Sequence, residues 1–333
     1  MISEGRCVRQ RAFLRCPSVV VLSLAGLVAA VPGQELRFKS GPEPQYTLIS
    51  AGERPVLKYR FAGVPRKPYV EELYTPGGVQ LLLDAPEDHK HHHGLMFALA
   101  VDGVDFWAEG QGCGGQMIRE SKTQTLPRTN GVLLTEALDW GGGGRKSVLL
   151  EQRRIQVHGG DIAQTAEFTL VTWRSTLKLP ESVAEAQLSG GHYFGLGLRF
   201  VRGMDKVGKF MNSDNADGEV VRGDETLYPG RWCAYTASVD GKPVTVAMFD
   251  GPNNIRPATW FTMADPFAYL SATLKLHKEP LTLKAGQSLQ LTYGIAAWDG
   301  AIEPAQIEKV YRLWLGKLVT EKAAEPAEQE PKP

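Results

Sequence analysis

Cysteine is scarce in this sequence, and the few cysteines present form no pattern. The chain has four cysteines in 333 residues, and two of them precede residue 17. The other two, Cys113 and Cys233, leave open either one disulfide or two buried thiols, because a single distant pair has no diagnostic spacing. A small scaffold held together by several disulfides is therefore excluded.

An excess of charge is also lacking, since 37 Lys and Arg residues balance 37 Asp and Glu residues. Without a basic surplus, neither a nucleic-acid-binding surface nor a polybasic membrane patch is indicated. The longest apolar run, residues 19–31, is shorter than the roughly 20 residues that a membrane-spanning helix needs. A protein that crosses the bilayer several times is excluded.

Two further absences narrow the fold. No repeat of 20–50 residues is visible, which argues against a propeller or a solenoid. No glycine-rich loop joins a strand to the start of a helix, so a phosphate-binding fold is not indicated. The run of glycines at residues 141–144 lies between two predicted strands and is interpreted as a surface connection.

The first residues have the pattern of an export signal. Four arginines precede or border the apolar run, and small residues follow it. Residues 1–33 therefore predict a cleaved signal peptide, with an uncleaved anchor as the alternative, and a secreted or periplasmic protein. Cleavage removes four Arg and one Glu, which leaves 33 basic and 36 acidic residues and no membrane span in the mature chain.

From Tyr46 onward, apolar and polar residues alternate in short segments between turn-forming residues. Leu57, Tyr59 and Phe61, for example, alternate with lysine and arginine, which is typical of a half-buried strand. Residues 95–101 are apolar throughout, which predicts a strand buried on both faces. Further strands are predicted at residues 131–140, 147–157, 163–172, 192–202, 232–239, 244–249, 267–276 and 288–298.

About a dozen strands predict an all-β fold, a large antiparallel β-sandwich of two sheets, over a single domain at residues 34–318. One helix is expected at residues 303–318, closing one end of the sandwich, because apolar residues recur there with helical spacing. Residues 319–333 contain Glu, Ala, Pro and Lys without core residues, which predicts a disordered tail.

Four of the seven histidines fall within five residues, at His89, His91, His92 and His93, directly after Asp88. Imidazole serves in proton transfer near neutral pH and as a metal ligand, so this segment is the main candidate site. In an extended chain the first, second and fourth of these histidines share one face. Alternate side chains lie about 6.6–7 Å apart, so two of the three plus a ligand from another strand would hold Zn or Cu. A polar loop without function is the alternative.

A second candidate segment contains His192, Tyr193 and Arg199. Alternation places Tyr193 and Arg199 on one face with Gly195 and Gly197 between them. This arrangement predicts an open glycine floor for a polar ring, with a hydroxyl and a cation at its edges. His192 falls on the other face, where a hydrogen-bonded core histidine is an equally good interpretation.

A third candidate is the polar loop at residues 249–261, which contains Asn254, Arg256 and Trp260. Amide and guanidinium groups bind sugar hydroxyls, and an indole covers the apolar face of a sugar ring. The alternative is a turn-rich connection whose tryptophan belongs to the core.

Several segments together resemble one protein family, the secreted bacterial proteins automatically labelled "methane oxygenase PmoA". The most specific are residues 86–94, around the histidines, and residues 101–107, Val-Asp-Gly-Val-Asp-Phe-Trp; residues 74–78, 194–196, 253–260 and 293–300 add to them. The resemblance covers residues 45–315 and implies a galactose-mutarotase-like β-sandwich in the context of sugar metabolism. Such proteins usually have His-Pro before the asparagine of the third loop, where this chain has Asp250-Gly251-Pro252.

The leading hypothesis is a secreted carbohydrate-active enzyme, either a hydrolase, a lyase or an epimerase, which acts on a carbohydrate or another small polar substrate. In this hypothesis, His91 or His92 acts as the general acid or base, and Asp88 orients an imidazole. A non-catalytic sugar-binding or cell-surface module is the alternative, and a metal-dependent oxygenase is a distant third. The predicted substrate-binding residues are Tyr193, Arg199, Asn254, Arg256 and Trp260, and the predicted metal ligands are His89, His91 and His93.

Overall fold

A computed structural model describes residues 1, 35–41, 45–62, 66–142, 145–159 and 167–324. The predicted signal peptide and residues 325–333 of the predicted tail lie outside this part. The compact unit Val31–Pro333 contains every strand and the helix. No helix among the described residues is both long and apolar enough to cross a membrane.

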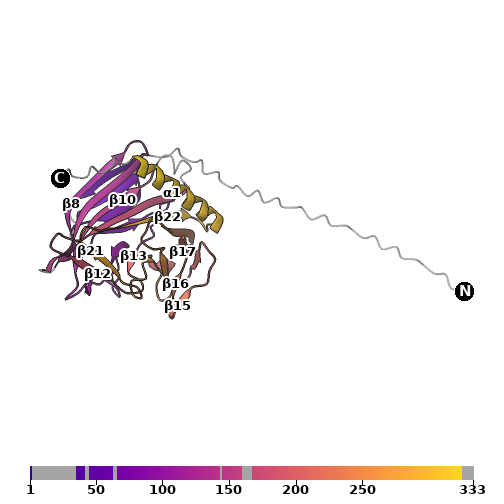
Figure 1. Ribbon diagram of the computed structural model, residues 1–333. Coiled ribbons are helices and arrows are strands. Elements are labelled where there is room, and N and C mark those ends of the chain that lie inside the picture. Colours follow the sequence, from indigo (N-terminus) through magenta and orange to yellow (C-terminus); the bar gives the residue numbers. More distant parts are fainter. Residues whose placement is uncertain (2–34, 42–44, 63–65, 143–144, 160–166, 325–333) are drawn as a thin grey trace. The chain divides into compact units, whose positions relative to one another are not determined.

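The unit is built from three antiparallel sheets, two large and one small (Figure 1). The 10-stranded sheet has the order β1 (Leu36–Gly41), β2 (Tyr46–Ala51), β3 (Arg54–Arg60), β4 (Tyr69–Leu73), β5 (Leu95–Ala98), β13 (Gly195–Arg199), β20 (Tyr269–Thr273), β19 (Thr259–Met263), β16 (Glu225–Tyr228) and β15 (Glu219–Arg222). The 8-stranded sheet has the order β14 (Lys209–Asn212), β17 (Trp232–Val239), β18 (Lys242–Asp250), β22 (Ser288–Asp299), β11 (Thr169–Lys178), β10 (Arg145–Val157), β9 (Gly131–Gly142) and β8 (Gly115–Leu126). The small sheet contains β21 (Leu281–Lys284), β12 (Glu185–Ser189), β6 (Ala100–Val101) and β7 (Val104–Asp105).

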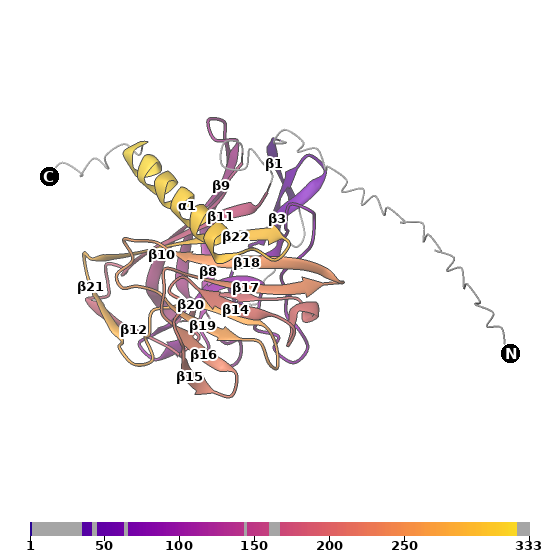
Figure 2. The ribbon, with the colours of Figure 1, turned by 90° about the vertical axis from the view of Figure 1, so that its right-hand side faces the viewer.

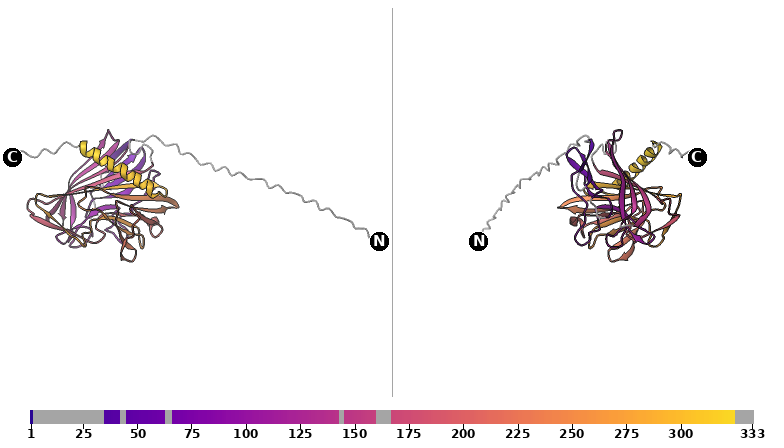
Figure 3. Two further views of the ribbon diagram at one scale, coloured as in Figure 1. Left: turned by 45° about the vertical axis from the view of Figure 1, so that its right-hand side comes forward. Right: turned by 90° about the vertical axis from the view of Figure 1, so that its left-hand side faces the viewer.

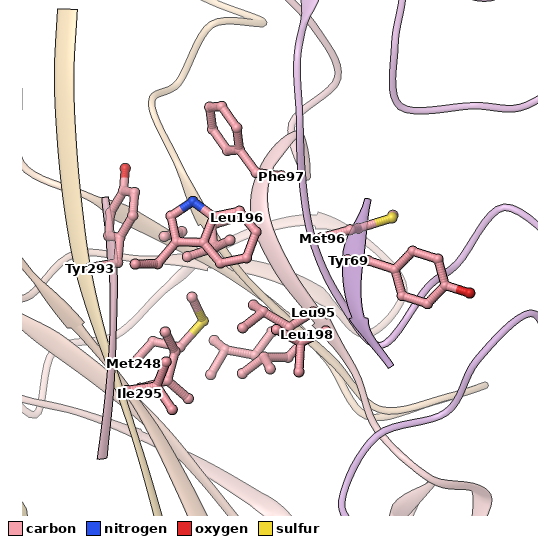
Figure 4. Packing of buried hydrophobic residues seen from close by; sticks show 14 of the residues in the cluster. Tyr69, Leu95, Met96, Phe97, Leu196, Leu198, Met248, Tyr293 and Ile295 are labelled. Carbon is pink, nitrogen blue, oxygen red and sulfur yellow. The ribbon is translucent and has the colours of Figure 1, made fainter. Parts of the chain in front are cut away.

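The main core lies between the two large sheets. In Figure 4, the core face of the 10-stranded sheet carries Leu95, Leu196 and Leu198. Met248 and Ile295 of the 8-stranded sheet belong to the same core cluster. Residues 95–101 are buried as predicted, but they form two strands, β5 and β6, which belong to different sheets. The β-sandwich predicted from the alternation is confirmed, with the small third sheet as an addition.

The opposite face of the 10-stranded sheet carries a second set of large side chains. Met96 is paired with Gly197, Arg199 with Tyr269, and Tyr269 with Met263. Residues paired across antiparallel strands lie on the same face, so these five residues line one surface. Met96 points away from the core in Figure 4. This outer face becomes the floor of the candidate site.

The predicted C-terminal helix is present as α1 (Pro304–Ala324), and a short 3-10 helix, η1 (Arg202–Met204), follows β13. Apolar residues of α1, among them Ile307 and Trp314, pack against Phe249 and Trp298 of the 8-stranded sheet. The helix therefore covers the outer face of this sheet and does not close an end of the sandwich as predicted. Figures 2 and 3 show it on the side of the unit away from β15 and β16. It also continues past residue 318, into the predicted tail.

Several element boundaries differ from the prediction. The strand predicted at residues 192–202 covers only Gly195–Arg199. Residues 163–166 of the strand predicted at residues 163–172 lie outside the described part, and β11 covers Thr169–Lys178. The strand at residues 232–239 has the predicted bounds. Cys113 and Cys233 are both free thiols, and Cys233 is buried.

Candidate functional site

The histidine segment forms two consecutive turns. Asp84 and His93 pair as an isolated antiparallel bridge, which closes the base of the segment. Within it, the N–H of His89 donates to the carbonyl of Pro86 at 2.9 Å, and the N–H of His92 donates to the carbonyl of His89 at 2.9 Å. The prediction of an extended segment with alternating faces is therefore wrong. Turns change which imidazoles lie together.

Three imidazoles gather as a result, and they are not the three that alternation selects. The ring centroid of His92 lies 4.7 Å from those of His89 and His91, and the latter two are 5.9 Å apart. The indole of Trp107 lies 4.9 Å from both His91 and His92. The turns thus place three imidazoles and an indole in one cluster.

His93 lies apart from this cluster and has both ring nitrogens engaged. Its Nδ1 lies 2.7 Å from Asp84 Oδ1, and its Nε2 lies 3.0 Å from Glu109 Oε1. A metal ion on His93 would have to displace a carboxylate, so the predicted set His89, His91 and His93 does not fit Zn or Cu. Within the described ranges, no group of three or more His, Cys, Asp or Glu side chains is arranged to hold a metal ion.

The cluster forms one wall of a pocket of about 270 Å³, which we call the histidine pocket. Its floor is the outer face of the 10-stranded sheet, at β16, β19 and β20. Tyr193, directly before β13, and Trp107, after β7, provide the other walls. The histidine pocket is lined by His89, His91, His92, Trp107, Tyr193, Arg222, Glu225, Phe261, Met263, Phe267 and Tyr269.

Polar atoms without partners are concentrated at this pocket. His92 Nδ1, Trp107 Nε1 and Tyr269 Oη are buried, and none has a hydrogen-bond partner of ordinary geometry among the described residues. Buried polar groups are nearly always hydrogen-bonded, because an unpaired group loses its water without compensation. Three such atoms around one pocket are therefore suited to bind a polar ligand.

The protonation states around the pocket are set mainly by burial. Loss of hydration lowers the pKa of His92 to about 2, and the neighbouring histidines add to this effect. Burial and His89 lower the pKa of His91 as well. Burial raises the pKa values of Tyr193 and Tyr269, and the nearby Trp107 N–H opposes part of the rise at Tyr269. At neutral pH, the pocket thus offers the uncharged imidazoles of His91 and His92 and the protonated phenols of Tyr193 and Tyr269.

Arg199 lies behind the pocket wall and does not line the pocket. Its Nη1 donates to the carbonyl of Phe200 at 3.0 Å and to Asp205 Oδ1 at 3.1 Å, and its guanidinium lies over the Phe267 ring at 4.3 Å. Its Nε and Nη2 have no hydrogen-bond partner among the described residues. In this position, Arg199 supports the Phe267 wall from beneath.

The predicted glycine floor is occupied by protein atoms. A Cβ at Gly197 would lie 2.0 Å from the Tyr269 hydroxyl, and one at Gly195 would lie 2.0 Å from the carbonyl oxygen of Ala272. These glycines therefore make room for Tyr269 and for close strand pairing, and they leave no open backbone for a ligand.

The residues of the third predicted segment lie elsewhere. Asn254 accepts a 2.7 Å hydrogen bond from the N–H of Thr292, Arg256 donates to the carbonyl of Leu274 at 3.0 Å, and Trp260 is fully buried with its indole N–H on a backbone carbonyl. All three anchor the chain locally, and none lines the histidine pocket. Trp260 thus belongs to the core, and Asn254 lines a different pocket, together with Arg154 and Arg174.

Asp88 contacts a different imidazole from the predicted ones. Its Oδ2 lies 3.1 Å from His89 Nδ1, and its Oδ1 lies 3.4 Å from Arg202 Nη2. The interaction with His89 lowers the pKa of Asp88. Asp88 is therefore positioned to orient His89, and not His91 or His92.

Sequence reasoning gave no role to Arg222 and Glu225, which line the pocket opposite the histidine turn, although it considered His192, which contacts Glu225. His192 Nε2 lies 2.9 Å from Glu225 Oε2, and Arg222 Nη2 donates to Glu225 Oε1 at 2.6 Å. Arg222 and Glu225 belong to one hairpin, β15–β16, and His192 lies about 30 residues earlier, so no spacing signal connects it with them. Trp107 did have a signal, because it ends the Val-Asp-Gly-Val-Asp-Phe-Trp segment.

The comparisons with known proteins agree with this fold. A family model matches residues 46–312, so the chain belongs to the family of unknown function DUF6807. No curated protein matches the chain. Among solved structures, the GH36 α-galactosidase AgaB from Geobacillus stearothermophilus has a TM-score of 0.50 and 9% identity over 80% of this chain and 41% of its own. The chain thus spans about two fifths of that enzyme's length.

A proposed aldose 1-epimerase from Klebsiella pneumoniae subsp. pneumoniae MGH 78578 matches with a TM-score of 0.39 and 10% identity over 82% of this chain and 80% of its own. The chain is a β-sandwich whose structural neighbours are carbohydrate-active proteins. At these identities the similarity concerns the fold.

Proposed function

We propose that the protein is a carbohydrate-active enzyme that binds its substrate in the histidine pocket and transfers protons there. The observation that carries the proposal is the convergence of three buried polar atoms, on His92, Trp107 and Tyr269, none with a hydrogen bond of ordinary geometry, at one aromatic-lined pocket. Sugar sites combine such polar groups, which bind hydroxyls, with aromatic faces, which cover the apolar side of the ring.

The composition of the pocket favours an epimerase or a lyase over a hydrolase. Most glycoside hydrolases use two carboxyl groups separated by roughly 5–9.5 Å. Glu225 is the single carboxylate among the described residues that line the histidine pocket, and His192 and Arg222 already hold it. Imidazole and phenol groups suit proton abstraction from carbon or oxygen, which epimerases and lyases require.

His91 is the residue that we assign as the general base. Its lowered pKa keeps the imidazole neutral and able to accept a proton at neutral pH. His92 is a poor proton acceptor, because its pKa of about 2 means that the charged form is strongly disfavoured. We therefore assign His92 and Tyr193 to hydrogen bonding with the substrate, with the protonated phenol of Tyr193 as a donor.

The proposal predicts different effects for two histidine variants. His91→Ala should lower kcat/KM about 10²- to 10⁴-fold, the range for loss of a general base, and leave substrate binding largely intact. His92→Ala should mainly weaken binding, because it removes a buried hydrogen-bonding group. A screen of saccharides for turnover, with affinity measured by calorimetry, checks both effects.

His277→Ala provides the control, since this histidine is partly exposed and does not line the pocket. It should retain both turnover and affinity. Full turnover in both the His91 and His92 variants would exclude the assignment of these residues to catalysis.

A non-catalytic sugar-binding module is the second candidate. One observation favours it: His92 is unsuited to accept protons and His192 and Arg222 already hold Glu225, so His89 and His91 are the imidazoles left for proton transfer among the described lining residues. Sugar binding without turnover by the unaltered protein would support the module.

Export is a further part of the proposal, because residues 1–33 have the pattern of a signal peptide. Sequencing the N-terminus of the protein from the culture medium or periplasm tests it. The resemblance to proteins labelled "methane oxygenase PmoA" also suggests a metal-dependent oxygenase. The structure gives this reaction no support at His93, because both ring nitrogens of His93 are engaged by the carboxylates of Asp84 and Glu109.

A further inference from the structure

A second pocket lies beside the histidine pocket, on the other side of His91. It has a volume of about 470 Å³, and His91 lines both pockets. If one part of a ligand occupied the histidine pocket and another part of the same ligand occupied the second pocket, both parts would contact the His91 imidazole. The second pocket is lined by Arg66, Ala85, Lys90, His91, His93, Glu109 and Gly110.

Positive charge predominates around the second pocket. Arg66 and Lys90 line it, and Lys67 is fully buried at its base. Glu109 is its one carboxylate among the described lining residues, and that charge is already compensated. Lys67 Nζ lies 2.7 Å from Glu109 Oε1, and His93 Nε2 lies 3.0 Å from the same oxygen.

The compensation of Glu109 leaves the other cations available to a ligand. Burial disfavours a charged His93, but its hydrogen bonds to Asp84 and Glu109 outweigh this and raise its pKa. Besides burial and His89, the positive charges of Lys67 and His93 lower the pKa of His91, and the carboxylate of Glu109 opposes them. The field of the second pocket therefore reaches the imidazole that the two pockets share.

We propose that the second pocket binds the anionic substituent of an acidic saccharide, a uronate carboxylate or a sulfate ester, whose sugar ring occupies the histidine pocket. The inference rests on the proposed function and specifies its substrate class. Arg66 and Lys90 supply charge and hydrogen bonds to the anion, and His91 lies between the anion and the ring.

The chemistry of a uronate agrees with this placement. Cations around its carboxylate make the neighbouring C–H bond more acidic, because they stabilise the negative charge that develops there. When this bond breaks, the proton passes to His91 and the electron pair moves into the carboxylate group. A proton from the Tyr193 phenol to the opposite face inverts the carbon, and the phenol then regains a proton from solvent. Alternatively, the oxygen substituent at the next carbon departs with the proton from His91 and leaves a double bond. Neither course needs an oxidant or a reductant.

Affinity measurements on the full chain test the inference with three ligands: a uronate trisaccharide, its neutral counterpart and a sulfated counterpart. The unaltered protein should prefer at least one anionic ligand, and the preference should decrease as the salt concentration rises. The double variant Arg66→Gln/Lys90→Gln should weaken anionic binding about five- to tenfold and leave neutral binding unchanged. Lys242→Gln, an exposed lysine at the start of β18, is the matched control.

The outcomes separate the two proposals. Preference for the uronate identifies a carboxylate as the anion, and preference for the sulfated sugar identifies a sulfate. Equal binding of all three ligands, unaffected by the double variant but weakened by His92→Ala, would overturn the anion site and leave the proposed function intact. Absence of binding to any of them, with no effect of His91→Ala or His92→Ala on turnover of other sugars, would overturn both.

Discussion

At the scale of single residues, the histidine spacing located the candidate site but not its geometry. A run of four imidazoles in five positions marks the segment without any structure. Which of them meet depends on backbone hydrogen bonds at Pro86 and His89, which form turns that alternation cannot reveal. The unpaired atoms of Trp107 and Tyr269 were equally out of reach, because a missing partner is a property of the folded chain.

A buried glutamate gives a residue-scale prediction about stability. Glu136 lies inside the sandwich, where Tyr59 donates a hydrogen bond to it. Burial raises its pKa to about 7, although Arg153 opposes the rise. In the unfolded chain the same carboxyl ionises near its ordinary pKa of about 4.3. The unfolded state therefore releases its proton first, and stability declines as the pH rises from about 4.3 to about 7.

In the wild type, the ionisation of Glu136 should lower the free energy of unfolding by on the order of 3 kcal/mol over this pH range. The variant Glu136→Gln should abolish this contribution. Urea unfolding at pH 5 and pH 8 measures it. Glu120→Gln, an exposed position on β8, should keep the wild-type pH dependence. An unchanged pH dependence in Glu136→Gln would show that this carboxyl ionises normally in the folded protein.

At the scale of elements, most strands were predicted where apolar residues are regularly spaced. The predicted ends were wrong where local turns interrupt a strand. The strand at Trp232–Val239 was predicted to the residue, because turn-forming residues bound it at Pro229-Gly230 and Asp240-Gly241. The strand around Arg199 is shorter than predicted, because a turn near Tyr193 precedes it and η1 follows it. The helix was predicted from its apolar spacing, but the face that it covers depends on sheet topology.

The helix gives an element-scale prediction. Trp314 is fully buried, and its indole N–H donates to Thr172 Oγ1 at 2.9 Å. Trp314→Ala should cost about 3–5 kcal/mol of unfolding free energy, because it leaves a large cavity between helix and sheet. Leu313→Ala, at a neighbouring exposed position of α1, should change stability by no more than about 0.5 kcal/mol.

Denaturant unfolding checks both helix variants. Saccharide affinity of the folded Trp314→Ala protein should remain unchanged, since α1 covers the 8-stranded sheet and the histidine pocket lies on the other large sheet. Equal stability losses in the two variants would contradict the packing of α1 through Trp314.

At the scale of the whole unit, the site exists because of strand order. In the 10-stranded sheet, β5 pairs with β13, β13 with β20, and β19 with β16. These pairings bring the histidine turn, Tyr193, Glu225 and Tyr269 to one surface although they are far apart along the chain. The sequence indicated a sandwich, but it contained no signal for these long-range neighbours. For the same reason, the sequence did not reveal that Asn254 and Arg256 lie outside the histidine pocket.

The most direct test of the central claim is an NMR titration of the histidine side chains with a saccharide that the protein binds. The chain has seven histidines, and single His→Gln variants assign their imidazole signals. We predict that the signals of His89, His91 and His92 shift on binding. The signal of His158, whose Nε2 lies 2.7 Å from Thr172 Oγ1 beside the other large sheet, should stay unchanged. Binding that shifts only His158, or none of the three clustered histidines, would contradict the histidine pocket as the saccharide site.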